Sequence, residues 1–289
     1  MFQIIGIVVL FGAVFGSYII SGGKLPVILE AAPHELMAIG GAGMAAFLIS
    51  NSVTTIKATA GSFGKVFAGP KWKASDYRDL LSLLFLLTKT MKSKGVIALE
   101  SHIERPADST IFSRFPKVTK DHFAVDFICD TLRMMTMNLE DPHQVEDAME
   151  KQLEKHHHEA LAPAGALQTL ADGLPALGIV AAVLGVIKTM GSITEPPAVL
   201  GAMIGGALVG TFLGVFLAYG LVGPFATRLQ AVVDEEASYY RIIQAVLVAH
   251  LHGNAAQISV EIGRGNVPSG AQPSFLELEE ALGAIPAEG

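Results

Sequence analysis

Four long runs without any charged side chain constrain this sequence more than any other feature. A helix needs about 20 apolar residues to cross a bilayer, and runs that approach this length indicate transmembrane segments. Charged residues make up only 16% of the chain, against about a quarter in a typical soluble domain. The charge-free runs are Met1–Gly23, Leu36–Ile56, Gly173–Ile187 and Pro196–Thr227.

These runs predict a polytopic membrane protein with four transmembrane helices. Short polar flanks extend some of the runs, because a side chain such as Lys188 at a helix end can reach the headgroup layer. We expect the first run to be a retained span, because it lacks a basic leading region and a good cleavage site. The predicted spans are residues 1–23, 34–56, 172–192 and 198–224.

Basic side chains beside the spans predict the orientation of the chain. Lys57, Lys65 and Lys71 follow the second span, whereas the connection before that span carries only Lys24. Cytoplasmic loops collect Lys and Arg. We therefore expect both termini and the stretch 57–171 on the cytoplasmic side.

The two polar parts of the chain, 57–171 and 225–289, read as helical. "SDYRDLLSLLFLLTKTMKSKG" has leucines at helical spacing and ends on Gly95, a residue type that often follows a helix. The tail predicts one amphipathic helix from Arg228 to Ile262, then a short acidic helix in "SFLELEEAL". The predicted fold class is all-α, with a helical cytoplasmic domain.

Small residues recur at four-residue spacing in two of the spans. Gly206, Gly210 and Gly214 share one face of the fourth span, and Gly12 and Gly16 do so in the first. Lipid gives no hydrophobic gain between helices, so close backbone approach must supply the contact. The spacing leaves open whether these faces pack within the chain or against other copies or a partner helix.

None of the four charge-free runs contains Asp, Glu, His or Arg. Proton and ion relays in membranes normally use an intramembrane carboxylate or histidine. The sequence therefore indicates either that the chain conducts nothing or that a second protein supplies the titrating group.

Other chemistries find no support in the residues. A net charge of −7 offers no basic surface for nucleic acid. His156, His157 and His158 are consecutive and point in different directions on a helix, so no metal site is expected. Cys129 is the single cysteine, in an apolar stretch that favours an inert thiol. No catalytic residues are identified, and the chain is not expected to be an enzyme or to hold a cofactor.

Several long motifs, in order along essentially the whole chain, resemble the MotA family of flagellar stator subunits, within the MotA/TolQ/ExbB superfamily. They are "GAVFGSYIISGG", "LESHIERP", "DGLPALGIVAAVLGVI", "GALVGTFLGVFLAYGLVGP" and "PSFLELEEAL". The resemblance implies a pentamer of this chain in the bacterial inner membrane, around a dimer of MotB. MotB would supply an intramembrane aspartate and a peptidoglycan-binding domain, and the cytoplasmic domain would push the rotor protein FliG.

The resemblance also implies residues for the ion path and its coupling. Pro175 and Pro224 match the two prolines that the family associates with conformational coupling. Thr211 matches a hydroxyl that lines the path, and Pro175 lies on that path as well. Ala182 stands where sodium-driven relatives tend to carry threonine, which favours the proton as the transported ion.

For the rotor contact, the resemblance implies Lys92 and Glu100. The family pattern has arginine at the position of Lys92, and lysine keeps the charge without the bidentate fork. A third family position, acidic in some members, is Gln152 here, between Glu150 and Glu154.

Two alternative functions remain at this point. An ExbB/TolQ-like energiser of outer-membrane processes would share the pentameric design, but such proteins usually have three spans. A passive membrane scaffold would conduct no ion with any partner.

Overall fold

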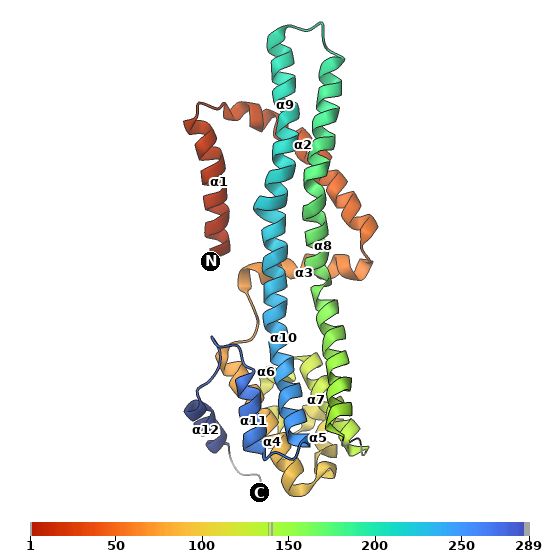
Figure 1. Cartoon of the computed structure of the whole chain (residues 1–289), viewed down its shortest axis with the longest axis vertical. Coiled ribbons are helices and arrows are strands. Elements are labelled where there is room, and N and C mark those ends of the chain that lie inside the picture. The colour runs from red at the N-terminus through yellow and green to blue at the C-terminus, as the bar shows by residue number, and fades with distance from the viewer. Residues whose placement is uncertain (1, 138, 140, 286–289) are drawn as a thin grey trace. The chain divides into compact units, whose positions relative to one another are not determined.

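A computed structural model of the chain describes residues 2–137, 139 and 141–285. The secondary structure is helical, with no strand among these described residues, which confirms the all-α prediction (Figure 1). The chain divides into two compact units. One comprises Met1–Gly69 and Ala160–Val232 and is termed the membrane unit, and the other comprises Pro70–Glu159 and Val233–Gly289 and is termed the charged unit.

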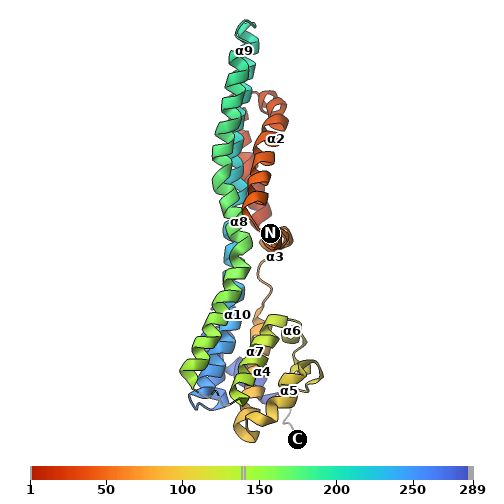
Figure 2. The same cartoon turned by 90° about the vertical axis from the view of Figure 1, so that its right-hand side faces the viewer.

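The helices long and apolar enough to cross a membrane number four in the described chain, as the sequence predicted. Helix α3 is shorter and runs across the direction of α8 and α9 rather than along it (Figures 1 and 2). The elements that contribute to the membrane unit are α1 (Phe2–Ile20), α2 (Leu25–Ser50), α3 (Val53–Ala68), α8 (Pro142–Met190), α9 (Pro197–Val215), a π-helical segment (Phe216–Val222) and α10 (Gly223–Leu251).

The second spanning helix differs from the predicted span of 34–56. Helix α2 already begins at Leu25, where Pro26 occupies the first turn, a position that suits proline because its missing N–H needs no partner there. It ends at Ser50, and Ser52 caps the separate helix α3 by accepting a 3.2 Å hydrogen bond from the Thr55 amide. The apolar helix α2 therefore includes Glu35, so the expectation of a bundle free of carboxylates is wrong for this helix.

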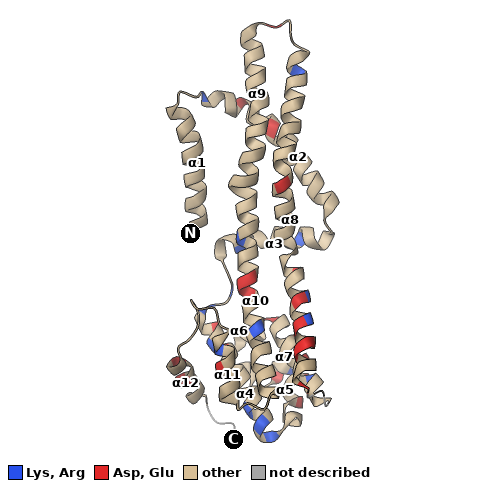
Figure 3. Cartoon of the chain, in the orientation of Figure 1, with Lys and Arg blue, Asp and Glu red and all other residues tan. Residues whose placement is uncertain are grey.

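Few large side chains are buried in the membrane unit. Helix α1 has no buried residue, and α1 and α9 carry no charge along their length (Figure 3). Apolar side chains that face outward suit a lipid environment, in which burying them gains little. The small core of this unit consists of Ile39, Leu174, Ala181, Val209, Leu213 and Ala218.

The charged unit has a conventional hydrophobic core. Helix α4 supplies Leu80, Leu81, Leu83, Leu84 and Leu87, all without solvent exposure. This helix ends as predicted at Gly95, whose φ of 83° lies in the left-handed region that glycine tolerates. Parts of α8 and α10 also lie in this unit. Its other elements are η1 (Val96–Leu99), α5 (Glu100–Glu104), η2 (Pro106–Asp108), η3 (Phe112–Arg114), α6 (Pro116–Thr119), α7 (His122–Thr136), α11 (Ala256–Gly265) and α12 (Phe275–Gly283).

The tail is not the single helix predicted from Arg228 to Ile262. Helix α10 ends at Leu251, and Gly253 adopts a φ of 88° before α11 begins at Ala256. The break lets Val260 of α11 pack into the same core as α4. The sequence "HGN" carries this turn signal, which the surrounding apolar periodicity obscured.

Candidate functional site

Helices α8 and α9 approach each other so closely that their backbones touch. A Cβ atom at Gly178 would lie 2.9 Å from the Gly210 carbonyl oxygen, and one at Gly214 would lie 2.7 Å from the Leu174 carbonyl oxygen. Only glycine fits at such distances. The glycines of the fourth span at 210 and 214 therefore pack within the chain, whereas Gly12 and Gly16 have open space beside them.

The contacts between α8 and α9 fix which residues lie at the same level. Gly178 meets Gly214, Ala181 meets Gly210, and Gly185 meets Ala207, as expected for antiparallel helices. Ala182 directly follows Ala181 on α8, and Thr211 directly follows Gly210 on α9. The structure thus brings these two predicted path residues to one level, and both are partly buried.

Pro175 lies on α8 apart from that level. It is seven residues before Ala182, and the helical rise places it roughly 10 Å away along the axis. Its neighbour Leu174 presents the carbonyl oxygen that faces Gly214. The proline thus lies beside the tightest part of the α8–α9 contact.

Pro224 directly follows an irregularity that the sequence analysis missed. Residues Phe216–Val222 form a π-helical segment, and the Gly223 amide donates to the Ala218 carbonyl. Proline has no N–H and its ring crowds the carbonyl four residues earlier, so a wider turn before it relieves the conflict. In the sequence, the irregular turn was indicated only by Gly220 and Pro224, two poor helix formers four residues apart in an apolar helix.

Glu35 is an ionisable residue that lies just before the charge-free run Leu36–Ile56, and the sequence analysis gave it no role. Its carboxylate lies against Gly210 of α9, where an added Cβ would collide with Oε2. It is partly buried, on the face of α2 that also contributes Ala31, Ala32 and Ile39 to the core. These residues recur at helical spacing. An apolar stripe that contains one carboxylate was therefore the signal in the sequence that Glu35 faces the packed side of the helix.

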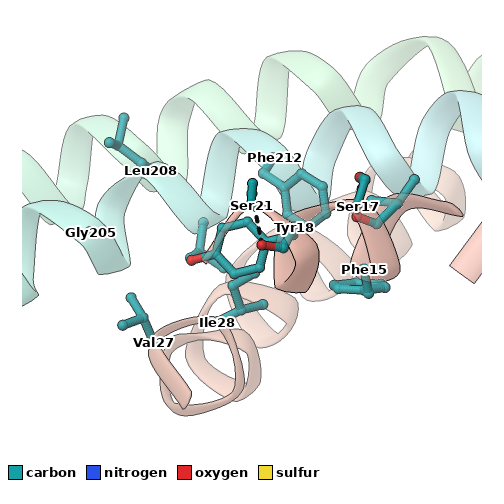
Figure 4. A pocket seen from close by; sticks show the side chains of 11 residues that line it. Phe15, Ser17, Tyr18, Ser21, Val27, Ile28, Gly205, Leu208 and Phe212 are labelled. Carbon is teal, nitrogen blue, oxygen red and sulfur yellow. Dashed lines mark hydrogen bonds between the residues drawn. The ribbon is translucent and has the colours of Figure 1, made fainter. Parts of the chain in front are cut away.

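A groove of about 750 Å³ lies between α1, α2 and α9 (Figure 4). Its lining contains no carboxylate, lysine, arginine or histidine. The hydroxyl of Ser21 donates to the Tyr18 carbonyl at 2.8 Å, and the remaining surface is mostly apolar. This groove suits hydrocarbon rather than an ion. Its lining residues include Phe15, Ser17, Tyr18, Val27, Ile28, Leu208 and Phe212.

In the charged unit, Lys92 and Glu100 lie at the ends of two successive α-helices, α4 and α5. Lys92 is exposed in the last turn of α4, and Glu100 is exposed at the first residue of α5. Neither forms an ion pair within the described residues. Arg133 of α7 forms a 2.8 Å ion pair with Glu104 of α5 at the surface. Both predicted rotor residues are thus exposed at helix ends.

Gln152 lies elsewhere on helix α8 and is partly buried. Its neighbour Glu150 accepts a 3.0 Å hydrogen bond from the Gln244 side chain, whereas Glu154 is exposed. No contact recorded for the described residues joins Gln152 to Lys92 or Glu100.

His250 adds a buried polar group beside Lys92. Its side chain is 8% exposed, and burial, together with the nearby Lys92 ammonium, lowers the pKa of His250 below its ordinary value. A neutral imidazole at this position avoids burying a positive charge next to the exposed lysine.

The remaining polar candidates have structural roles. His156 stacks on Phe123 with ring centroids 3.6 Å apart, and His157 Nε2 lies 3.2 Å from Asp234. Burial raises the pKa of Cys129 to about 12, so its thiol stays protonated. The described part of the chain has no cluster of side chains suited to a metal ion.

Comparison with known proteins defines the class first. The family model described as "MotA/TolQ/ExbB proton channel family" matches residues 120–242, and the model described as "Motility protein A N-terminal" matches residues 4–95. Motility protein A of Salmonella typhimurium is 40% identical over 285 residues, which cover 99% of this chain and 96% of the relative. The chain therefore belongs to the motility protein A family, within this class of proton channels.

Two solved structures share the fold. "Structure of C. jejuni MotAB" matches with a TM-score of 0.69 and 19% identity, over 92% of this chain and 95% of that one. "Structure of the flagellar MotAB stator complex from Bacillus subtilis" matches with a TM-score of 0.67 and 23% identity, over 89% and 92%. The chain is thus a multi-pass inner-membrane protein of the channel class and not an enzyme.

Proposed function

We propose that this chain is the channel-forming subunit of a flagellar stator, which converts proton flow into torque on the rotor. The observation that carries the proposal is the α8–α9 contact. Its glycine packing brings Thr211 and Ala182 to one level without any ionisable side chain on α9. The surface formed by α8 and α9 at this level can guide an ion only if another helix presents a carboxylate to it.

A single-span partner of the MotB type would present that carboxylate. The match to structures titled as MotAB complexes supports this partner. Thr211 would offer its hydroxyl to the partner's aspartate or to a hydrated ion without adding charge. The transported ion is proposed to be the proton, because Ala182 has no hydroxyl to help coordinate sodium.

The assembly is proposed to be a pentamer of this chain around a partner dimer, embedded in lipid. The open surfaces beside Gly12 and Gly16 support contacts beyond the single chain, since close helix packing in lipid uses such residues. Both termini and the charged unit are proposed to be cytoplasmic, as the basic residues after α2 suggest.

Coupling is proposed to involve Pro175 and Pro224. Each proline removes one backbone hydrogen bond from a helix that packs inside the membrane unit, and neighbouring groups can satisfy the freed carbonyl. Motion at these points would reach Lys92 and Glu100, which are proposed to contact charged residues of the rotor protein FliG.

The ExbB/TolQ-like alternative receives less support. The described residues contain four candidate spans rather than three, and a relative matched over 99% of this chain is a motility protein. A receptor-binding rather than a peptidoglycan-binding domain in the partner would favour that alternative.

The test is proton flux in cells that co-express this chain with its single-span partner, after removal of the partner's plug segment. We expect flux that disappears when the partner's intramembrane aspartate becomes asparagine. Pro175→Ala should leave the protein in the membrane and abolish or sharply slow swimming, because alanine supplies the backbone N–H that proline lacks and removes the ring from the preceding turn. Flux without the aspartate would contradict the channel role, and normal swimming torque in Pro175→Ala would contradict the coupling role.

A further inference from the structure

The packed face of α2 contains one carboxylate among apolar residues. Ile28, Ala31, Ala32 and Ile39 all contribute to the core against α8 and α9, and Glu35 occupies the same stripe one helical turn before Ile39. Glu30, by contrast, is exposed on the same helix. The position of Glu35 is therefore set by the packing of α2, and its side chain is partly buried where that of Glu30 is exposed.

Three helices meet at the Glu35 carboxylate. It lies against Gly210 of α9, and the Cβ of Ala181 of α8 is 3.3 Å from the position that a Gly210 Cβ would take. A larger residue than glycine at 210 would push the carboxylate away. The absence of a side chain on Gly210 thus creates the space that Glu35 fills.

The carboxylate lies at the level of the predicted ion path. Gly210 is roughly 20 Å along α9 from its start at Pro197, given the rise of an α-helix. Phe212, two residues further, packs edge-on against Phe15 of the spanning helix α1, with ring centroids 5.9 Å apart, so this level lies within the span of α1. Thr211 and Ala182 lie at the same level, one residue beyond Gly210 and Ala181.

A carboxylate packed between spanning helices needs a partner or a proton. Removing an ionised carboxylate from water costs far more than removing a protonated one. Among the described residues no hydrogen-bond donor meets Glu35. Ionisable residues inside membrane bundles commonly mark proton pathways, which is the use this position allows.

We propose that Glu35 is a second proton-binding group of the channel, beside the carboxylate of the partner. This inference rests on the proposed channel function. A proton from the side of the α2 N-terminus binds the Glu35 carboxylate and forms the neutral acid. The acid then releases the proton toward the partner's carboxylate near Thr211, and the Glu35 carboxylate is regenerated. No other bond changes.

The experiment measures proton flux through the full chain co-expressed with its plug-deleted partner. Glu35→Gln keeps the size and polarity of the side chain and removes proton binding. We expect flux to fall about tenfold or more, since a positioned proton-transfer group commonly contributes about 10²-fold or more. Glu35→Asp should restore much of the flux. Glu30→Gln removes the same charge from the exposed side of α2 and should leave flux unchanged.

A matched glycine pair displaces the carboxylate without changing it. A Cβ at Gly210 collides with Glu35, whereas a Cβ at Gly206 meets only Ala31 Cβ at an ordinary 3.7 Å. Gly210→Ala should therefore lower flux and Gly206→Ala should not. If Glu35→Gln fails to assemble in the membrane, the comparison of these two glycine variants tests the role of Glu35 instead.

The outcomes separate this inference from the proposed function. Flux that requires the partner's aspartate but is unchanged in Glu35→Gln, or is equal in Gly210→Ala and Gly206→Ala, would overturn the role of Glu35 alone. Flux that persists without the partner's aspartate would overturn the proposed function. Loss in Glu35→Gln with recovery in Glu35→Asp supports the inference, because a purely structural role would be met by glutamine as well.

Discussion

The two units of this protein differ in the side chains that pack inside each of them. The charged unit packs large residues, such as the fully buried Leu84 and Phe127, around a shared core. The membrane unit places its closest contacts at glycines, where the backbones of α8 and α9 touch. In water, burying large apolar area stabilises a fold, whereas in lipid the gain comes from close approach. Removing side-chain volume should therefore destabilise the charged unit, whereas adding side-chain volume should destabilise the membrane unit.

The largest expected loss of stability comes from removing volume in the charged unit. Leu84→Ala deletes a side chain with no solvent exposure and should cost about 2–5 kcal/mol. Thermal unfolding of the purified complex, followed in detergent, measures this loss. Ile97→Ala is the control, because Ile97 is 79% exposed and its truncation should cost under about 0.5 kcal/mol. Equal losses would remove the contrast between core and surface in this unit.

The next effect comes from adding volume in the membrane unit. Gly214→Ala puts a methyl group 2.7 Å from the Leu174 carbonyl oxygen and 2.8 Å from the Gly178 Cα, both backbone atoms that cannot swing aside. We expect a cost of about 1–3 kcal/mol, with loss of motility. Membrane protein level and swimming speed measure it. Gly201→Ala, on the same helix with nothing within 4 Å, should behave as wild type; a defect of the same size there would show that helix flexibility matters rather than contact.

The smallest effect on stability is expected at Lys92, because an exposed side chain takes part neither in the leucine-rich core nor in the glycine contacts. Lys92→Glu changes an exposed charge in the last turn of α4, so the unfolding temperature should shift little. Swimming should nevertheless weaken, because the proposed contact with FliG depends on charge. A reversed charge on the rotor protein should restore part of the swimming. If no such reversal restores it, the contact lies elsewhere.

The sequence predicted most of the fold because composition and periodicity carry it. Charge-free runs located the first, third and fourth spanning helices, and the leucine spacing of α4 with Gly95 at its end located that helix closely. The start of α2 was misplaced for the same reason. The predicted span began at residue 34, close to the start of the charge-free run, whereas α2 begins at Leu25 and includes Glu30 and Glu35.

The candidate site was predictable only in part. A resemblance supplied Thr211 and Ala182, but their common level depends on the register of α8 against α9, which no local pattern encodes. Gly210 stood out as part of a small-residue stripe, yet the sequence could not say that it faces Glu35 as well as α8. Contacts between residues far apart in the chain decide such features.

The π-helical segment at Phe216–Val222 has a consequence for how this chain can be compared or recombined with its relatives. A wider turn accommodates an extra residue without lengthening the helix in proportion. Deleting one residue there would restore ordinary α-helical bonding, and the tighter turn would largely offset the lost residue, so Gly223 to Val232 would keep nearly the same direction around the helix axis. The extra residue and the wider turn therefore belong together. Chimeric proteins joined within it must conserve residue number as well as residue type.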